Sequence, residues 1–146
     1  VAVTAFQLFR LMGFESLAEA LGASGEERDE MEYVAGMAMG RALVRKGSLP
    51  RGDLQQVIDA FGRFYEQLGL GLTYFHRHAD GSVALGIHEC AGCDGTPLVH
   101  RPVCYVEAGL VAGVFSEALG VDYKAHEVKC IGGLGDDACE FVLTEK

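Results

Sequence analysis

Residues 102–143 read PVCYVEAGLVAGVFSEALGVDYKAHEVKCIGGLGDDACEFVL, and this stretch decides the fold class that the sequence predicts. Its first part begins with Pro102, which suits the first turn of a helix, and ends at Gly120. Because this part is apolar almost all round, we expect a helix that is buried between a sheet and other helices. Ala-Gly pairs at 108–109 and 112–113 predict that another backbone approaches this helix closely.

The rest of the stretch contains two strand-like runs, 121–129 and 139–145, joined by a glycine-rich connector. A similar layout occurs earlier. Residues 53–69 predict a helix that Asp53 caps, and two further strand-like runs then follow, joined by Asp80-Gly81, a two-residue hairpin signal. The sequence therefore predicts helix-plus-hairpin twice.

The region before residue 53 indicates further helices. Residues 24–44 open with Ser24 and Glu27 in the spacing of a capping box, and a shorter amphipathic region extends from Phe6 past Gly13. Helices that pack on antiparallel strands define an α+β fold. We expect one domain over residues 1–146, with N-terminal helices on an antiparallel sheet of two hairpins and a buried helix between them.

Composition narrows the class of protein. Hydrophobic residues make up 49% and charged residues 23%, which is typical of a globular chain. The net charge of −9 and the lack of a basic groove argue against nucleic acid as a partner. Because the sequence has neither a membrane-length apolar run nor a signal-peptide pattern, we expect a cytoplasmic protein without a membrane span.

Five cysteines, an odd number, all lie in the second half of the chain. In a reducing compartment, clustered cysteines favour metal binding or catalysis over a disulfide framework. Within EVKCIGGLGDDACEF, residues 127–141, the zinc ligand types are Glu127, Cys130 and Cys139, and the glycines allow the connector to fold back. Cys104 is the natural fourth ligand, because it would join the buried helix to the hairpin. Such a closed set predicts a structural zinc site.

The proposed set makes one geometric demand. Glu127 and Cys130 are three residues apart, so in a regular strand they would point to opposite faces. We therefore expect a bend or bulge near residues 128–129. Asp136 and Asp137 are interpreted as turn-forming residues.

Cys90 and Cys93 form a C-x-x-C pair with three open interpretations: a redox pair, a second metal half-site, or alternative ligands for the first site. No nicotinamide, flavin or P-loop fingerprint is found, so hydride transfer lacks a donor site and an enzyme is the less favoured class.

An apolar pocket is a further expectation. Methionine-rich helix faces adapt to varied apolar ligands, and aromatic side chains can line the other walls. Each of these residues also fits a simple core role. The candidates are Met31, Tyr33, Met37, Phe61, Phe64, Tyr65, Tyr105 and Phe115.

The stretch 102–143 resembles the signature half of the 4-vinyl reductase, or hydrocarbon-binding, domain family. The matching features are the Pro-x-Cys helix start, the glycine-containing helix, Glu-x-x-Cys, and Gly-Asp-Asp-x-Cys-x-Phe. The chain departs from the family in lacking Trp, and its connector between the last two cysteines is slightly longer than in some sensors.

The resemblance implies relatedness to small transport-particle subunits and to sensor domains of aromatic-responsive activators. It implies a homodimer that holds a small hydrophobic or aromatic molecule, with zinc at the four positions named above. We expect a zinc-stabilised sensor or carrier. The alternatives are an accessory or carrier protein of tetrapyrrole metabolism and a purely structural assembly subunit.

Overall fold

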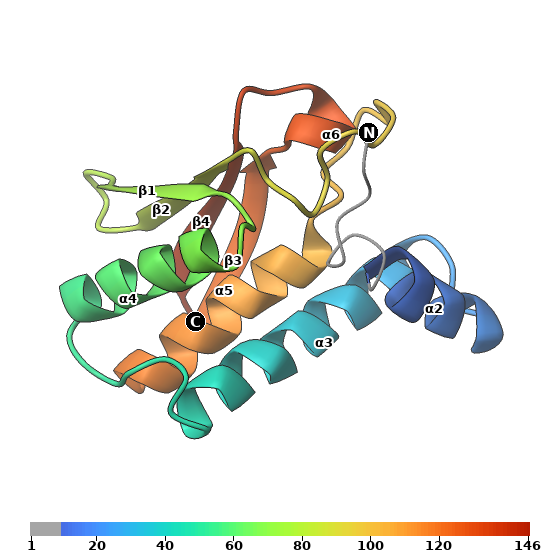
Figure 1. Ribbon diagram of the computed structural model, residues 1–146. Helices are drawn as coiled ribbons and strands as arrows, with labels where there is room; N and C mark the ends of the chain where they lie inside the picture. Colours follow the sequence, from blue (N-terminus) through green and yellow to red (C-terminus); the bar gives the residue numbers. More distant parts are fainter. Residues whose placement is uncertain (1–9) are drawn as a thin grey trace.

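The computed structural model describes residues 10–146 (Figure 1). Its helical elements are η1 (Arg10–Glu15, a π-helix), α2 (Ser16–Ala20), α3 (Glu26–Arg45), α4 (Leu54–Gln67), α5 (Tyr105–Leu119) and α6 (Ile131–Leu134). Its strands are β1 (Leu72–Arg77), β2 (Val83–His88), β3 (Tyr123–Lys129) and β4 (Cys139–Glu145). The predicted region that begins at Phe6 lies partly outside the described residues.

The four strands form one antiparallel sheet in the order β1-β2-β4-β3. The two predicted hairpins therefore join through their second strands. Helix α5 lies between the sheet and α3, and α4 packs on β1 and α5 (Figure 1). This arrangement confirms the predicted α+β fold with a buried helix. Within residues 10–146, no helix combines the length and the apolar composition that a membrane crossing requires.

Backbone contact between α3 and α5 confirms the close approach that the Ala-Gly pairs predict. Gly109 and Gly113 of α5 lie against the backbone of Tyr33 and Met37 in α3. In return, Gly36 lies against the backbone of α5. A Cβ atom at any of these glycines would overlap main-chain atoms of the other helix, so a larger residue would force the helices apart.

Local signals located helix α4 correctly. The backbone N–H of Gln56 donates to Asp53 Oδ1 at 2.9 Å, and the N–H of Asp53 donates to Gln56 Oε1 at 3.0 Å, which completes a capping box. The predicted capping box at Ser24 and Glu27 is wrong. Helix α3 begins one residue later, after Gly25, and has no side-chain cap.

Two other boundaries differ from the prediction. Five residues, 78–82, separate the paired ends of β1 and β2, because Asp80 Oδ1 accepts the N–H of Ser82 at 2.9 Å and widens the turn. Helix α5 begins at Tyr105 instead of Pro102. Its N-cap is Cys104, whose backbone N–H is bonded to a side chain of β3. Gly120 ends the helix in a left-handed conformation, as expected.

Candidate functional site

The five cysteines converge in the interior. Each has an exposed fraction of 0%, and none is in a disulfide. They come from the loop after β2, the N-cap of α5, the N-cap of α6 and the start of β4. Two groups have ligand atoms that all lie within 4.8 Å of one another: Cys104, Glu127, Cys130 and Cys139, and Cys90, Cys93, Cys104 and Cys139.

The first group is the predicted set of four, and the irregularity in β3 brings it together. Glu127 pairs with Phe141, but Lys129 pairs with Glu140, so the register shifts between Glu127 and Lys129. This confirms the bulge expected near residues 128–129. Asp136 Oδ2 then accepts the backbone N–H of Cys130 at 2.8 Å and closes the turn around α6, in keeping with its predicted role.

Three successive backbone N–H groups at the start of α6 point at sulfur atoms. Ile131 donates to Cys139 Sγ at 3.4 Å, and Gly133 donates to Cys130 Sγ at 3.3 Å. Gly132, between them, donates to Cys93 Sγ at 3.4 Å. Hydrogen bonds to the charged form of a group favour that form, so this turn favours thiolates.

The glycines of α6 have a second role that the sequence did not reveal. A Cβ on Gly132 would overlap the side chain of Thr96 and the carbonyl of Cys93, and one on Gly133 would overlap the carbonyl of Arg101. The loop after β2 therefore packs directly on α6. The sequence indicated the turn, but only the fold shows which backbone the glycines admit.

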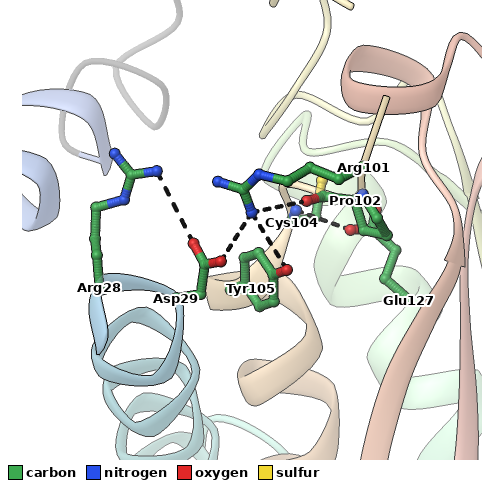
Figure 2. A network of polar contacts seen from close by, with 7 residues as sticks. All are labelled: Arg28, Asp29, Arg101, Pro102, Cys104, Tyr105 and Glu127. Carbon is green, nitrogen blue, oxygen red and sulfur yellow. Dashed lines mark hydrogen bonds and ion pairs between the residues drawn. The ribbon is translucent and has the colours of Figure 1, made fainter. Parts of the chain in front are cut away.

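Glu127 completes the first group. Its Oε2 atom accepts the backbone N–H of Cys104 at 2.9 Å (Figure 2). Its Oε1 atom is buried and has no hydrogen-bond partner among the described residues. Burial, together with the nearby Cys130 sulfur, raises the pKa of Glu127 to about 10. A cation among the thiols would satisfy this oxygen atom.

The sulfur spacings suit a tetrahedral ion. Cys104 Sγ lies 4.0 Å from Cys130 Sγ and 3.8 Å from Cys139 Sγ. A zinc–sulfur bond of about 2.3 Å gives a tetrahedral edge of about 3.8 Å. Hydrogen bonding with Cys104 lowers the pKa of Cys130 to about 6, which favours the ligating thiolate form. The donor set therefore fits zinc in a closed site.

A groove of about 700 Å³ lies between α3, α5 and β3. Tyr33, Met37 and Ala108 contribute to its apolar lining, and Glu127 lines it as well, so this carboxyl belongs to both the groove and the first cysteine group. Across the groove, the backbone N–H of Ala125 donates to the Tyr33 hydroxyl at 3.1 Å. The full lining is Glu26, Asp29, Glu30, Tyr33, Val34, Met37, Pro102, Tyr105, Ala108, Lys124, Ala125, His126, Glu127 and Lys146.

The structure separates the eight predicted pocket residues. Three of them line the groove: Tyr33, Met37 and Tyr105. Three are enclosed in the core with exposed fractions of 1% or less: Phe61, Tyr65 and Phe115. Phe64 packs against that core, and Met31 is half-buried and does not line the groove.

Sequence reasoning missed the polar network at one end of the groove. Arg101 donates to Asp29 Oδ2 at 2.8 Å and to the Tyr105 hydroxyl at 3.4 Å (Figure 2). Its guanidinium also lies 5.9 Å from the centre of the Tyr105 ring. No motif marks these residues, because they come from three separate segments of the chain.

Comparison with known proteins identifies the family. Residues 83–145, which contain β2, the buried helix and the cysteine cluster, match the model of the vinyl-4-reductase domain family. This part of the chain is a vinyl-4-reductase domain. The match confirms the predicted resemblance. Two uncharacterised proteins of Methanocaldococcus jannaschii are 27% and 25% identical to the chain over 111 and 134 residues. These alignments cover 76% and 92% of the chain, which thus spans 61% and 73% of the relatives.

Solved structures share the fold of the chain that carries this vinyl-4-reductase domain. A vinyl-4-reductase family protein from Methanocaldococcus jannaschii has a TM-score of 0.68 at 18% identity, covering 100% of this chain and 82% of its own. A trafficking protein particle complex subunit 3 from Naegleria fowleri, covalently bound to palmitic acid, has 0.71 at 18%, covering 97% and 95%. The phenol-responsive sensory domain of the transcription activator PoxR, with phenol, has 0.65 at 14%, covering 99% and 76%.

Proposed function

We propose that this vinyl-4-reductase domain protein is a binding module that holds a small apolar or aromatic molecule in the groove between α3, α5 and β3. The observation that carries the proposal is a groove of about 700 Å³ with an apolar lining and a buried carboxyl at one side. Small-molecule sites have volumes of roughly 300–1,000 Å³ and few polar groups. The phenol and the palmitic acid in two structures of the same fold support this class of ligand.

The groove's charged residues suit a ligand with one polar end. Lys124, His126 and Lys146 line it together with Glu26 and Glu30. A hydroxyl or carboxylate can hydrogen-bond there while the apolar part contacts Tyr33 and Met37. Such placement would fix the orientation of the molecule, as few polar groups commonly do in apolar sites.

We further propose a structural zinc ion at Cys104, Glu127, Cys130 and Cys139. The formal charge of these four ligands is −4, and one Zn²⁺ reduces it to −2 inside a buried site. The ion would tie the start of α5 to β3 and β4, which are the elements beside the groove. Its role would be to hold the groove's walls, since a closed set leaves no position for a reacting water.

A native mass spectrum of the purified chain tests the zinc proposal. We expect about one zinc ion per chain, and loss of that ion on Cys139→Ser. The absence of metal from a folded, fully reduced wild-type protein would contradict the zinc site. The homodimer remains a prediction, which the same spectrum reports.

Thermal shift and calorimetry with phenol as the probe test the groove. Val34 lines the groove and is 54% exposed, whereas Leu68 is 57% exposed and lies outside it. We expect Val34→Lys to abolish phenol binding and the matched control Leu68→Lys to retain it. Equal binding by the two variants would remove the groove as the site.

A further inference from the structure

We propose that Cys93 is an alternative fourth ligand of the zinc ion, on the side of Cys104, Cys130 and Cys139 away from Glu127. The site would then have two closed states, one with three thiolates and a carboxylate, and one with four thiolates. This inference rests on the proposed zinc site and adds a ligand to it.

The sulfur spacings carry the proposal. Cys93 Sγ lies 3.3 Å from Cys139 Sγ and 4.0 Å from Cys130 Sγ, and it is within 4.8 Å of Cys104 Sγ. With the Cys104 distances of 3.8 and 4.0 Å, the four sulfurs enclose a tetrahedron whose edges are close to the roughly 3.8 Å that zinc requires.

Cys93 and Glu127 approach the three shared sulfurs from different directions. Glu127 extends from β3 and lines the groove. Cys93 lies in the loop after β2, and its sulfur receives the N–H of Gly132 at the start of α6. The shared cysteines therefore form a common face, with one candidate ligand from the groove and one from the loop.

The loop holds Cys93 in place before any ion binds. The Thr96 hydroxyl donates to the carbonyl of Cys93 at 2.7 Å, and the backbone N–H of Cys93 donates to the carbonyl of Cys90 at 3.3 Å. Gly132 lets this turn rest against α6. A preorganised ligand costs less conformational entropy on binding.

The exchange gives the groove a route to the ion. When Glu127 turns toward a molecule in the groove, the Zn–O bond breaks and a Zn–S bond to Cys93 forms. The proton of the Cys93 thiol passes to the released carboxylate. The ion stays four-coordinate throughout, so the domain keeps its structural ion while Glu127 contacts the ligand.

Paired variants test this exchange, with zinc per chain measured by native mass spectrometry against a fixed concentration of chelator. We expect Glu127→Gln and Cys93→Ser each to retain about one ion, because each leaves one fourth ligand. The double variant should bind zinc at least about tenfold more weakly. Cys90→Ser in the Glu127→Gln background is the matched control, because Cys90 is a neighbouring buried thiol outside this tetrahedron, and it should retain the ion.

Loss of the ion from Glu127→Gln alone, or equal loss from the two double variants, would overturn the proposal. X-ray absorption at the zinc edge gives a readout that does not depend on the double variant folding. Four sulfur neighbours in Glu127→Gln support Cys93 as a ligand, and three overturn it. A wild-type protein without zinc would instead refute the proposed zinc site itself.

Discussion

Glu127 Oε2 accepts the backbone N–H of Cys104 at 2.9 Å, and this hydrogen bond joins β3 to the N-cap of α5 (Figure 2). The same carboxyl lines the groove and belongs to the cysteine group that fits zinc. A molecule in the groove and an ion among the thiols would therefore contact one shared side chain. Two ligands that bias the same group influence each other's affinity.

We expect zinc to strengthen the binding of phenol, because the ion fixes Glu127 at the side of the groove. Coupling of about 1–3 kcal/mol corresponds to a factor of about 5–150 in affinity. Calorimetry with zinc-loaded and chelated protein measures the factor. By reciprocity, phenol should strengthen zinc binding equally. Identical phenol affinities in the two forms would show that the sites are independent.

Removal of zinc should destabilise the fold, because the ion joins α5, β3 and β4. A ligand present at a thousand times its dissociation constant adds about 4 kcal/mol to the free energy of unfolding. For a chain of this size, we expect a chelator to lower the Tm by about 10 °C or more. The Cys139→Ser protein should melt at a low temperature that a chelator does not change. A Tm unaffected by chelation of the wild-type protein would contradict a structural ion.

The contact between α3 and α5 predicts the effect of adding a single methyl group. Gly113→Ala would place a Cβ against the backbone of Met37, and we expect a loss of about 1–3 kcal/mol in the free energy of unfolding. Gly62→Ala in α4 is the control. Its Cβ would meet only the Thr73 hydroxyl, which can rotate, and alanine favours the helix. Urea unfolding of the two variants should give opposite signs or a clear gap.

Local sequence signals located most of the elements. Asp53 and Gln56 lie three residues apart, so their capping box is visible in the sequence. Gly120 marks the end of α5 for the same reason. The boundary at Ser24 failed because an equally local alternative, a helix start at Gly25, prevailed. The start of α5 failed because a distant partner, Glu127, bonds the N–H of Cys104.

The candidate site divides along the same line. Glu127, Cys130 and Cys139 lie within one hairpin, so their spacing predicted that they would meet. Cys93 comes from a different hairpin, and its position depends on how the loop after β2 rests on α6. The apolar periodicity of α4 and α5 marked Phe61 and Phe115 as inward-facing. It does not say whether the inward side meets core or groove, because that depends on elements elsewhere in the chain.

The Tyr74 hydroxyl donates to Glu140 Oε2 at 2.8 Å, across the strands β1 and β4. Burial and this carboxylate raise the pKa of Tyr74 to about 12, above its ordinary value of about 10. The folded protein therefore keeps a proton that the unfolded chain loses, so this contribution to stability is complete below pH 10 and disappears as the pH rises through 12. We expect urea unfolding to show a steeper loss of stability between about pH 10 and 12 for the wild-type protein than for Tyr74→Phe. At pH 7, Tyr74→Phe should be about 1 kcal/mol less stable from the lost hydrogen bond, and parallel pH slopes would contradict the assignment.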